Sequence, residues 1–210
     1  MACLRWILVL LLVAAAPACN RAGLRIPGAA GAFHPARTGY VASQGSSRAV
    51  RVAIPTDSRE AHLGERVAGT RWKGCRTDPF WAGSAPRTLA VELERELRSS
   101  QIFREVNPVD DSSALVLETD MHALCAQAIG FLFIRVAGIT SLHFTLRDGN
   151  TVLYDETIER VVTDADEEYT GPSAAFIEQA MKILISDSLR EVLEQLLPAL
   201  DDVPLSGQAT

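Results

Sequence analysis

Residues 138–162, GITSLHFTLRDGNTVLYDETIERVV, carry the clearest fold signal in the chain. Two stretches rich in β-branched, aromatic and leucine residues, 138–146 and 151–162, flank the sequence Asp148-Gly149-Asn150. An Asp-Gly pair supplies the positive φ angle that a tight hairpin turn requires. This stretch therefore predicts an antiparallel β-hairpin.

Further strands are predicted on the N-terminal side of this hairpin. Residues 49–54 alternate weakly and are rich in valine and isoleucine, and Pro55 ends the stretch. Two more strands are predicted at 105–108 and 114–124. The second of them places alternating side chains on one face, beginning with Leu115 and Leu117.

Two amphipathic helices complete the pattern. Ser84 is a typical helix cap with a proline in the first turn, and Leu89, Leu93 and Leu97 then recur at helical spacing. The last helix begins near residue 172 and has a long apolar stripe. The element order β-α-β-β-β-β-α predicts an α+β domain over residues 49–198. We expect an antiparallel sheet of about five strands with both helices packed on one face.

Three segments resemble a known group of periplasmic domains. They are Arg51-Val52-Ala53-Ile54-Pro55 running into Asp57-Ser58-Arg59, the helix end Leu93-Glu94-Arg95-Glu96-Leu97 leading to Ile102-Phe103-Arg104-Glu105-Val106, and Ala114-Leu115-Val116-Leu117. On these segments the chain resembles lipoproteins with a fold like the N-terminal domain of TolB. Curli-secretion-type and ABC-transport auxiliary lipoproteins are similar in architecture. The resemblance implies support of envelope assembly or transport rather than a shared reaction.

The N-terminus is typical of a cleaved secretory signal, assigned to residues 1–18. Arg5 precedes an apolar run over residues 6–16, which is far shorter than the roughly 20 residues of a membrane-spanning helix. The run ends in Ala16-Pro17-Ala18-Cys19, which resembles a bacterial lipobox. That resemblance implies cleavage before Cys19, a thioether-linked diacylglycerol and an N-acyl chain such as palmitate. The alternatives are a soluble secreted protein with a free Cys19 thiol and an uncleaved signal anchor.

The segments flanking the predicted domain have little to bury. Residues 20–48 are rich in Gly, Ala, Ser and Pro, so 19–48 is interpreted as the lipidated cysteine and a flexible tether. Residues 199–210 are interpreted as a disordered tail. Asn20 follows the cysteine, and by resemblance to the enterobacterial sorting rule this residue favours the outer membrane.

Charge and cysteine usage narrow the possible functions. The chain has 20 basic and 26 acidic side chains, a net charge of −6 that disfavours non-specific binding to nucleic acid. Of four cysteines, Cys3 lies in the signal and Cys19 at its end, which leaves Cys75 and Cys125 in an oxidising compartment. A disulfide between them would close a loop of about 50 residues and contribute roughly 4 kcal/mol. Two separate buried thiols are the alternative.

Motifs that would carry catalysis are absent from the sequence. It has no Gly-x-Ser-x-Gly, phosphate loop, dinucleotide fingerprint or His-Glu-x-x-His. His122, Cys125 and His143 are too few for a closed metal site, which normally needs four ligands. Ser141 and His143 share one side of a strand, but the sequence places no acid to orient the histidine. We therefore expect neither an enzyme, nor a metal, nor a cofactor.

One apolar stretch between the predicted strands has two interpretations. Its apolar residues are Ile129, Phe131, Leu132, Phe133, Ile134 and Val136. They form either a strand end buried on both faces or an exposed loop that contacts a partner protein or lipid. The sequence as a whole favours a membrane-anchored, non-catalytic lipoprotein that supports an envelope transport, secretion or assembly complex. Lipid or hydrophobic-ligand binding by residues 129–136 is the alternative.

Overall fold

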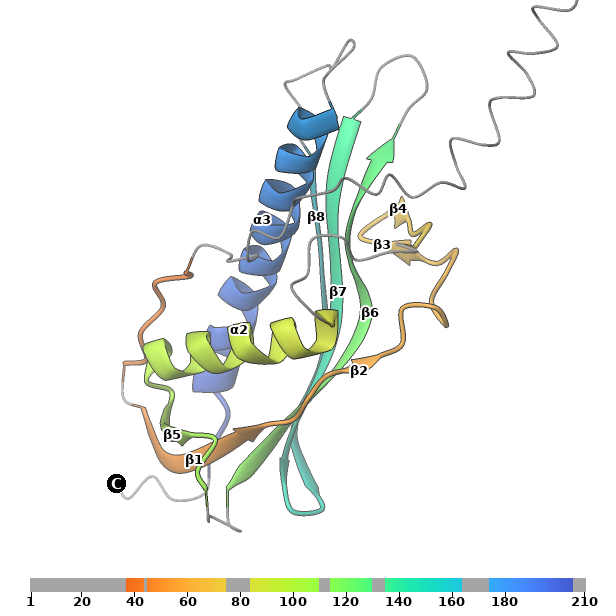
Figure 1. Cartoon of the computed structure of the whole chain (residues 1–210). Coiled ribbons are helices and arrows are strands. Elements are labelled where there is room, and N and C mark those ends of the chain that lie inside the picture. The colour runs from red at the N-terminus through yellow and green to blue at the C-terminus, as the bar shows by residue number, and fades with distance from the viewer. Residues whose placement is uncertain are drawn as a thin grey trace, which may run out of the picture.

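A computed structural model describes residues 37–43, 45–74, 84–109, 114–129, 135–163 and 174–205 (Figure 1). In chain order the elements are β1 (Ser46–Val52), β2 (Thr56–Asp57), β3 (Arg66–Val67), β4 (Thr70–Arg71), α2 (Ala85–Ser100), β5 (Phe103–Val106), β6 (Leu115–Ile129), β7 (Arg135–Asp148), β8 (Thr151–Thr163) and α3 (Ala174–Asp201). The α+β class is confirmed. Among the described residues, no helix is both long and apolar enough to cross a membrane.

The main sheet is mixed, which corrects the prediction of an antiparallel sheet. Its strand order is β5-β1-β6-β7-β8, and β2 also pairs with β6. β1 runs parallel to both β5 and β6, whereas β6, β7 and β8 pair antiparallel. The reason is the chain between β1 and β5, which includes α2. A crossover of this kind returns the chain in the same direction and so makes parallel pairing possible.

The predicted hairpin is confirmed as β7 and β8. Asp148 pairs with Thr151, so Gly149 and Asn150 form the turn, and Gly149 has a φ of +55°. The neighbouring hairpin of β6 and β7 is longer than predicted, because pairing continues to Ile129 and Arg135.

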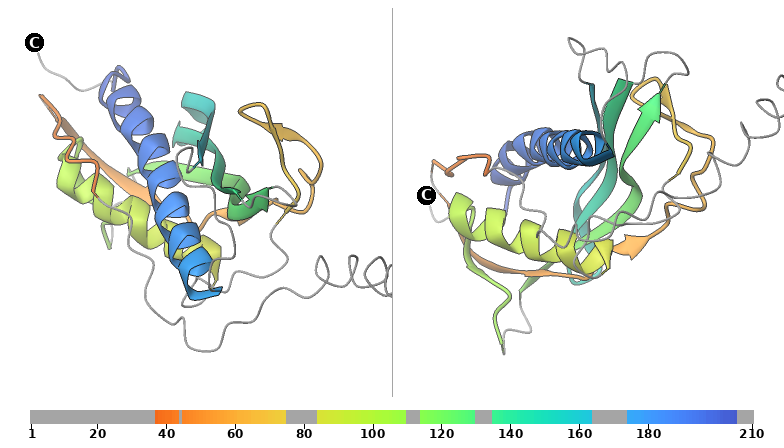
Figure 2. Two further views of the ribbon diagram at one scale, coloured as in Figure 1. Left: turned by 90° about the horizontal axis from the view of Figure 1, so that it is seen from above. Right: turned by 45° about the horizontal axis from the view of Figure 1, so that its top comes forward.

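Both helices cover the same face of the sheet, as the sequence predicts (Figures 1 and 2). The leucines of α2 at 89, 93 and 97 and the stripe of α3 from Leu184 to Leu200 are buried in one apolar core with β6 and β7. Residues 199–201 continue α3, and Val203 and Leu205 are buried against the same core. The described part of the predicted tail therefore packs on the domain.

The opposite face of the sheet carries a second, smaller core. Residues 56–74, here called the arm, comprise β2, a turn and the β3–β4 hairpin, and Figure 1 shows the arm on the far side of the sheet from the helices. Trp72 of the arm is fully buried against the sheet. The members of this core are Val67, Trp72, Ala123, Cys125, Ala137 and Ile139. The arm explains why the strands β6 and β7 are apolar on both faces in this region.

Candidate functional site

The apolar stretch 129–136 spans the end of the β6–β7 hairpin. Ile129 and Arg135 are the last pair in the register. Val136 is completely buried in the main core, as the interpretation of a buried strand end expects for this residue. Residues Phe131, Leu132, Phe133 and Ile134 lie outside the described residues.

The two cysteines of the expected disulfide are placed only in part. Cys125 is 3% exposed and lies in the small core next to Trp72. Cys75 lies outside the described residues, as does Cys19. The described segment before Cys75 ends at Gly74. Three residues before Gly74, the main-chain oxygen of Arg71 accepts a hydrogen bond of 3.3 Å from the side-chain amide of Gln127. The segment that leads to Cys75 is thus fastened beside Cys125, and the disulfide stays a prediction.

Residues 37–43, which precede β1 and fall within the predicted tether, are hydrogen-bonded to both helices. The main-chain N–H and hydroxyl of Thr38 donate to the Glu96 carboxylate on α2, at 3.2 and 2.9 Å. Tyr40 donates its hydroxyl to Asp201 at the end of α3, at 2.8 Å. This hydrogen bond raises the pKa of Tyr40 to about 12. No pattern in the sequence predicts these contacts, because Glu96 and Asp201 look like ordinary charged residues on the surface of a helix.

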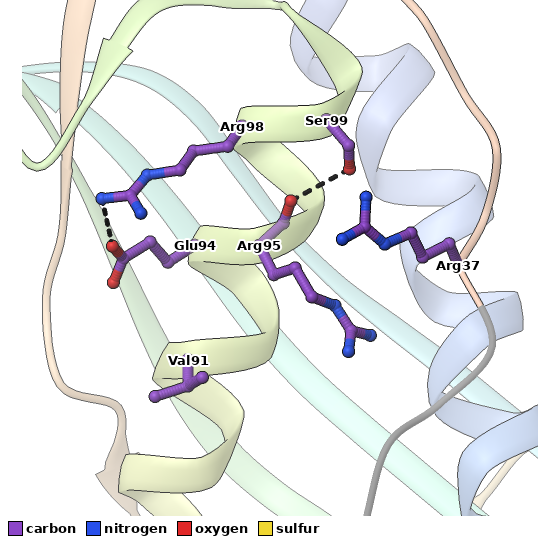
Figure 3. A pocket seen from close by; sticks show the side chains of 6 residues that line it. All are labelled: Arg37, Val91, Glu94, Arg95, Arg98 and Ser99. Atoms are coloured by element: carbon purple, nitrogen blue, oxygen red, sulfur yellow. Dashed lines mark hydrogen bonds and ion pairs between the residues drawn. The ribbon is translucent and has the colours of Figure 1, made fainter.

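A groove of about 520 Å³ lies on α2 beside the start of the described chain (Figure 3). Its lining residues are Arg37, Val91, Glu94, Arg95, Arg98 and Ser99. Arg98 forms an ion pair with Glu94, and Arg95 contacts the buried carboxylates of Glu92 and Glu96 at 2.5 and 3.7 Å. Apart from Val91 the lining residues are polar or charged, and the arginines on α2 pair with carboxylates.

Three histidines form a row across the outer face of the sheet, on the side that carries the arm. His62 comes from the arm, His122 from β6 and His143 from β7. The rings of His62 and His122 stack with centroids 3.8 Å apart and planes 22° apart. The ring of His143 lies 6.0 Å from that of His122, with planes 4° apart. We call these three residues the histidine row.

Each ring of the histidine row lies beside one carboxylate. Glu65 contacts His62 Nδ1 at 2.9 Å, Asp120 lies 3.5 Å from His122 Nε2, and Asp155 lies 3.0 Å from His143 Nε2. The strand register explains the position of Asp155: this residue pairs with Thr145, which lies two residues from His143 on β7. The sequence alone could not place this acid beside His143, since the contact requires the pairing of β7 with β8.

The row differs from both a metal centre and a catalytic triad. Within the described ranges, no group of three or more His, Cys, Asp or Glu is arranged to hold a metal ion. Ser141 donates its hydroxyl to Glu159 at 3.2 Å, which directs the hydroxyl to an acid rather than to His143. Burial lowers the pKa of His122, and the neighbouring His62 lowers it further, while Asp120 opposes the shift. The stacked rings of His62 and His122 join the arm to the sheet.

No protein-family model and no curated protein matches the sequence. Among solved structures, a protein of the family DUF330 from Xanthomonas campestris is similar with a TM-score of 0.53 and 14% identity, covering 80% of this chain and 93% of that one. A minor lipoprotein from Acinetobacter baumannii gives a TM-score of 0.44 and 12% identity, covering 75% of this chain and 92% of that one. The likeness to the Xanthomonas campestris protein shows that the two chains share a fold.

Proposed function

We propose that this protein is a membrane-anchored, non-catalytic lipoprotein that supports an envelope transport, secretion or assembly complex through protein contacts. The observation that carries the proposal is the sequence Ala16-Pro17-Ala18-Cys19 directly after an 11-residue apolar run, 6–16. Three acyl chains on Cys19 would hold the protein almost irreversibly, because each buried methylene contributes about 0.8 kcal/mol. Asn20 supports an outer-membrane location for the anchor.

The contacts before β1 support an anchor on the helix side of the domain. Arg37 follows Cys19 by 18 positions, so at most about 60–65 Å of chain separates them. Because Thr38 and Tyr40 are bonded to α2 and α3, the described chain begins beside these helices. The outer face of the sheet, with the arm, lies on the opposite side of the sheet.

The end of the β6–β7 hairpin is the proposed contact for that partner. Between the paired residues Ile129 and Arg135, the sequence Gly130-Phe131-Leu132-Phe133-Ile134 has four apolar side chains in a row. Apolar residues gathered at the end of a hairpin are typical of a protein or membrane contact. Lipid binding by the same residues is the alternative.

Site-specific photo-crosslinking in the native envelope distinguishes the two. A photo-reactive amino acid replaces Phe131, and the matched control replaces Val109, which is 91% exposed and follows β5 by three residues. We expect a discrete protein adduct from position 131 that is missing from position 109. Adducts with lipid alone would support the lipid-binding alternative. Identical adducts from both positions would contradict a specific contact at the hairpin end.

A further inference from the structure

We propose that the histidine row is a pH-sensitive contact that holds the turn of the arm, residues 58–65, on β6 and releases this turn when the surroundings become acidic. The proposal stands on the stacking of His62 on His122, which joins the arm to the sheet with centroids 3.8 Å apart. The two side chains are 26% and 20% exposed, so both rings are largely covered while they are stacked.

The turn has few other contacts with the sheet. At its start, the main-chain N–H of Ser58 donates to the carbonyl of Met121 at 3.1 Å. The hydrogen bonds Ala61 N to Ser58 O and Glu65 N to His62 O, at 2.9 and 3.2 Å, remain inside the turn and do not hold it on β6. The stacked histidine pair is therefore the side-chain contact that joins the turn directly to β6, beside the hydrogen bonds between the turn and the buried Trp72.

Charged groups surround the row on four elements. They are Asp57, Arg59, Glu60 and Glu65 on the arm, Glu118 and Asp120 on β6, Arg147 on β7, and Asp155 and Glu159 on β8. Several of these charges already have partners. Arg59 pairs with Asp57 at 2.7 Å, Arg147 pairs with Glu118 at 2.9 Å, and Glu159 accepts from the main-chain N–H of Ala68 at 2.9 Å.

Protonation opposes the stacked arrangement. If both rings are protonated, two positive charges face each other with ring centroids 3.8 Å apart. The Asp120 carboxylate lies 3.5 Å from His122 and only partly offsets this repulsion. Burial comes first among the causes that lower the pKa of His122 in the docked state. When the turn is released, the pKa of His122 returns toward its ordinary value of about 6.5. The released state therefore binds protons more readily, so docking is favoured above that pH and weakened as the pH falls through it.

Release of the turn also changes the surroundings of Trp72. The indole N–H of Trp72 donates to the main-chain carbonyl of Arg59 at 3.4 Å, and the main-chain N–H of Trp72 donates to the main-chain carbonyl of Glu65 at 2.8 Å. Gly64 donates to the carbonyl of Trp72 at 2.9 Å. Because the turn covers an indole that is completely buried, its release admits solvent to Trp72.

The experiment uses the fluorescence of Trp72 in the full-length chain. The other two tryptophans, Trp6 and Trp81, are replaced by phenylalanine. Acrylamide quenching and the emission maximum are followed from pH 8 to pH 5, with the far-UV circular dichroism recorded at each step. We expect stronger quenching and a red shift of the emission below about pH 6.5, with an unchanged circular dichroism spectrum.

The decisive variant is His122→Gln, which removes the ring whose pKa is lowered in the docked state and should abolish the pH response of Trp72. His62→Phe keeps an aromatic ring on His122 but removes the neighbouring imidazole, and it should weaken the response. A wild-type chain that keeps Trp72 equally protected at pH 8 and pH 5 would overturn the proposal. So would an acid-induced exposure that is the same in wild type and His122→Gln.

Discussion

Gly138 is where the sheet and the last helix approach most closely, and its replacement by alanine tests that packing. A Cβ atom at this position would lie 2.0 Å from the carbonyl oxygen of Leu184, 2.3 Å from its carbonyl carbon and 2.9 Å from the nitrogen of Ile185. All three are main-chain atoms of α3, so no side chain can swing aside to make room. The helix itself would have to move away from β7.

The size of the effect follows from that displacement. Restoring an ordinary contact of 3.4 Å from 2.0 Å requires a local shift of α3 by about 1.4 Å, in an interior that is packed as densely as an organic crystal. Overpacking of this kind costs about 1–3 kcal/mol, and a clash with a helix main chain belongs at the upper end. For a domain of this size, about 3 kcal/mol corresponds to a fall of about 6–12 °C in Tm.

Thermal and urea unfolding of Gly138→Ala measure this loss, with Gly149→Asn as the control. Gly149 has a positive φ but no atom within 4 Å of a Cβ, and asparagine tolerates that backbone conformation. The control should therefore stay within about 0.5 kcal/mol of wild type, in the ordinary range for surface substitutions. Equal stability of Gly138→Ala and wild type would refute the close contact of α3 with β7.

Three further predictions concern the contacts on which the function is proposed to depend. Tyr40→Phe removes the hydrogen bond to α3 and should cost about 1 kcal/mol in chemical unfolding, whereas no loss would show that this bond does not hold the chain before β1. Phe131→Ser combined with Phe133→Ser should leave the Tm unchanged and abolish capture of the partner or of lipid from the native envelope, whereas a large loss of Tm would place these side chains in the core. Mass spectrometry before and after reduction should show a gain of about 2 Da for the pair Cys75 and Cys125, and an unchanged mass would exclude the disulfide.

Local patterns of sequence predicted the local elements of the fold. The sequence Asp148-Gly149-Asn150 predicts a tight turn because glycine readily adopts the positive φ angle that such a turn requires, and the structure has this turn between β7 and β8. Leu89, Leu93 and Leu97 repeat at helical spacing, and all three are buried on one side of α2. Such signals need no knowledge of distant residues, because each depends on neighbours within one or two turns of chain.

Contacts between distant segments were not predictable in this way. The parallel pairing of β1 with β6 depends on the path of the chain through α2, and the residues of β1 themselves do not indicate that path. The stacking of His62 on His122 joins residues 60 positions apart and requires the arm to fold over the sheet. Next to the apolar stretch 129–136, the paired parts of β6 and β7 are apolar on both faces, and the arm with Trp72 covers the outer-face residues Cys125, Ala137 and Ile139.

The mass of the N-terminal peptide, from protein purified out of bacterial membranes, tests the proposed anchor most directly. The account predicts a peptide that begins at Cys19 and carries the added mass of a diacylglyceryl thioether and one N-acyl chain. A Cys19→Ser variant should lose this modification and leave the membrane fraction. A mature chain with an unmodified Cys19, or one that retains residues 1–18, would contradict the account.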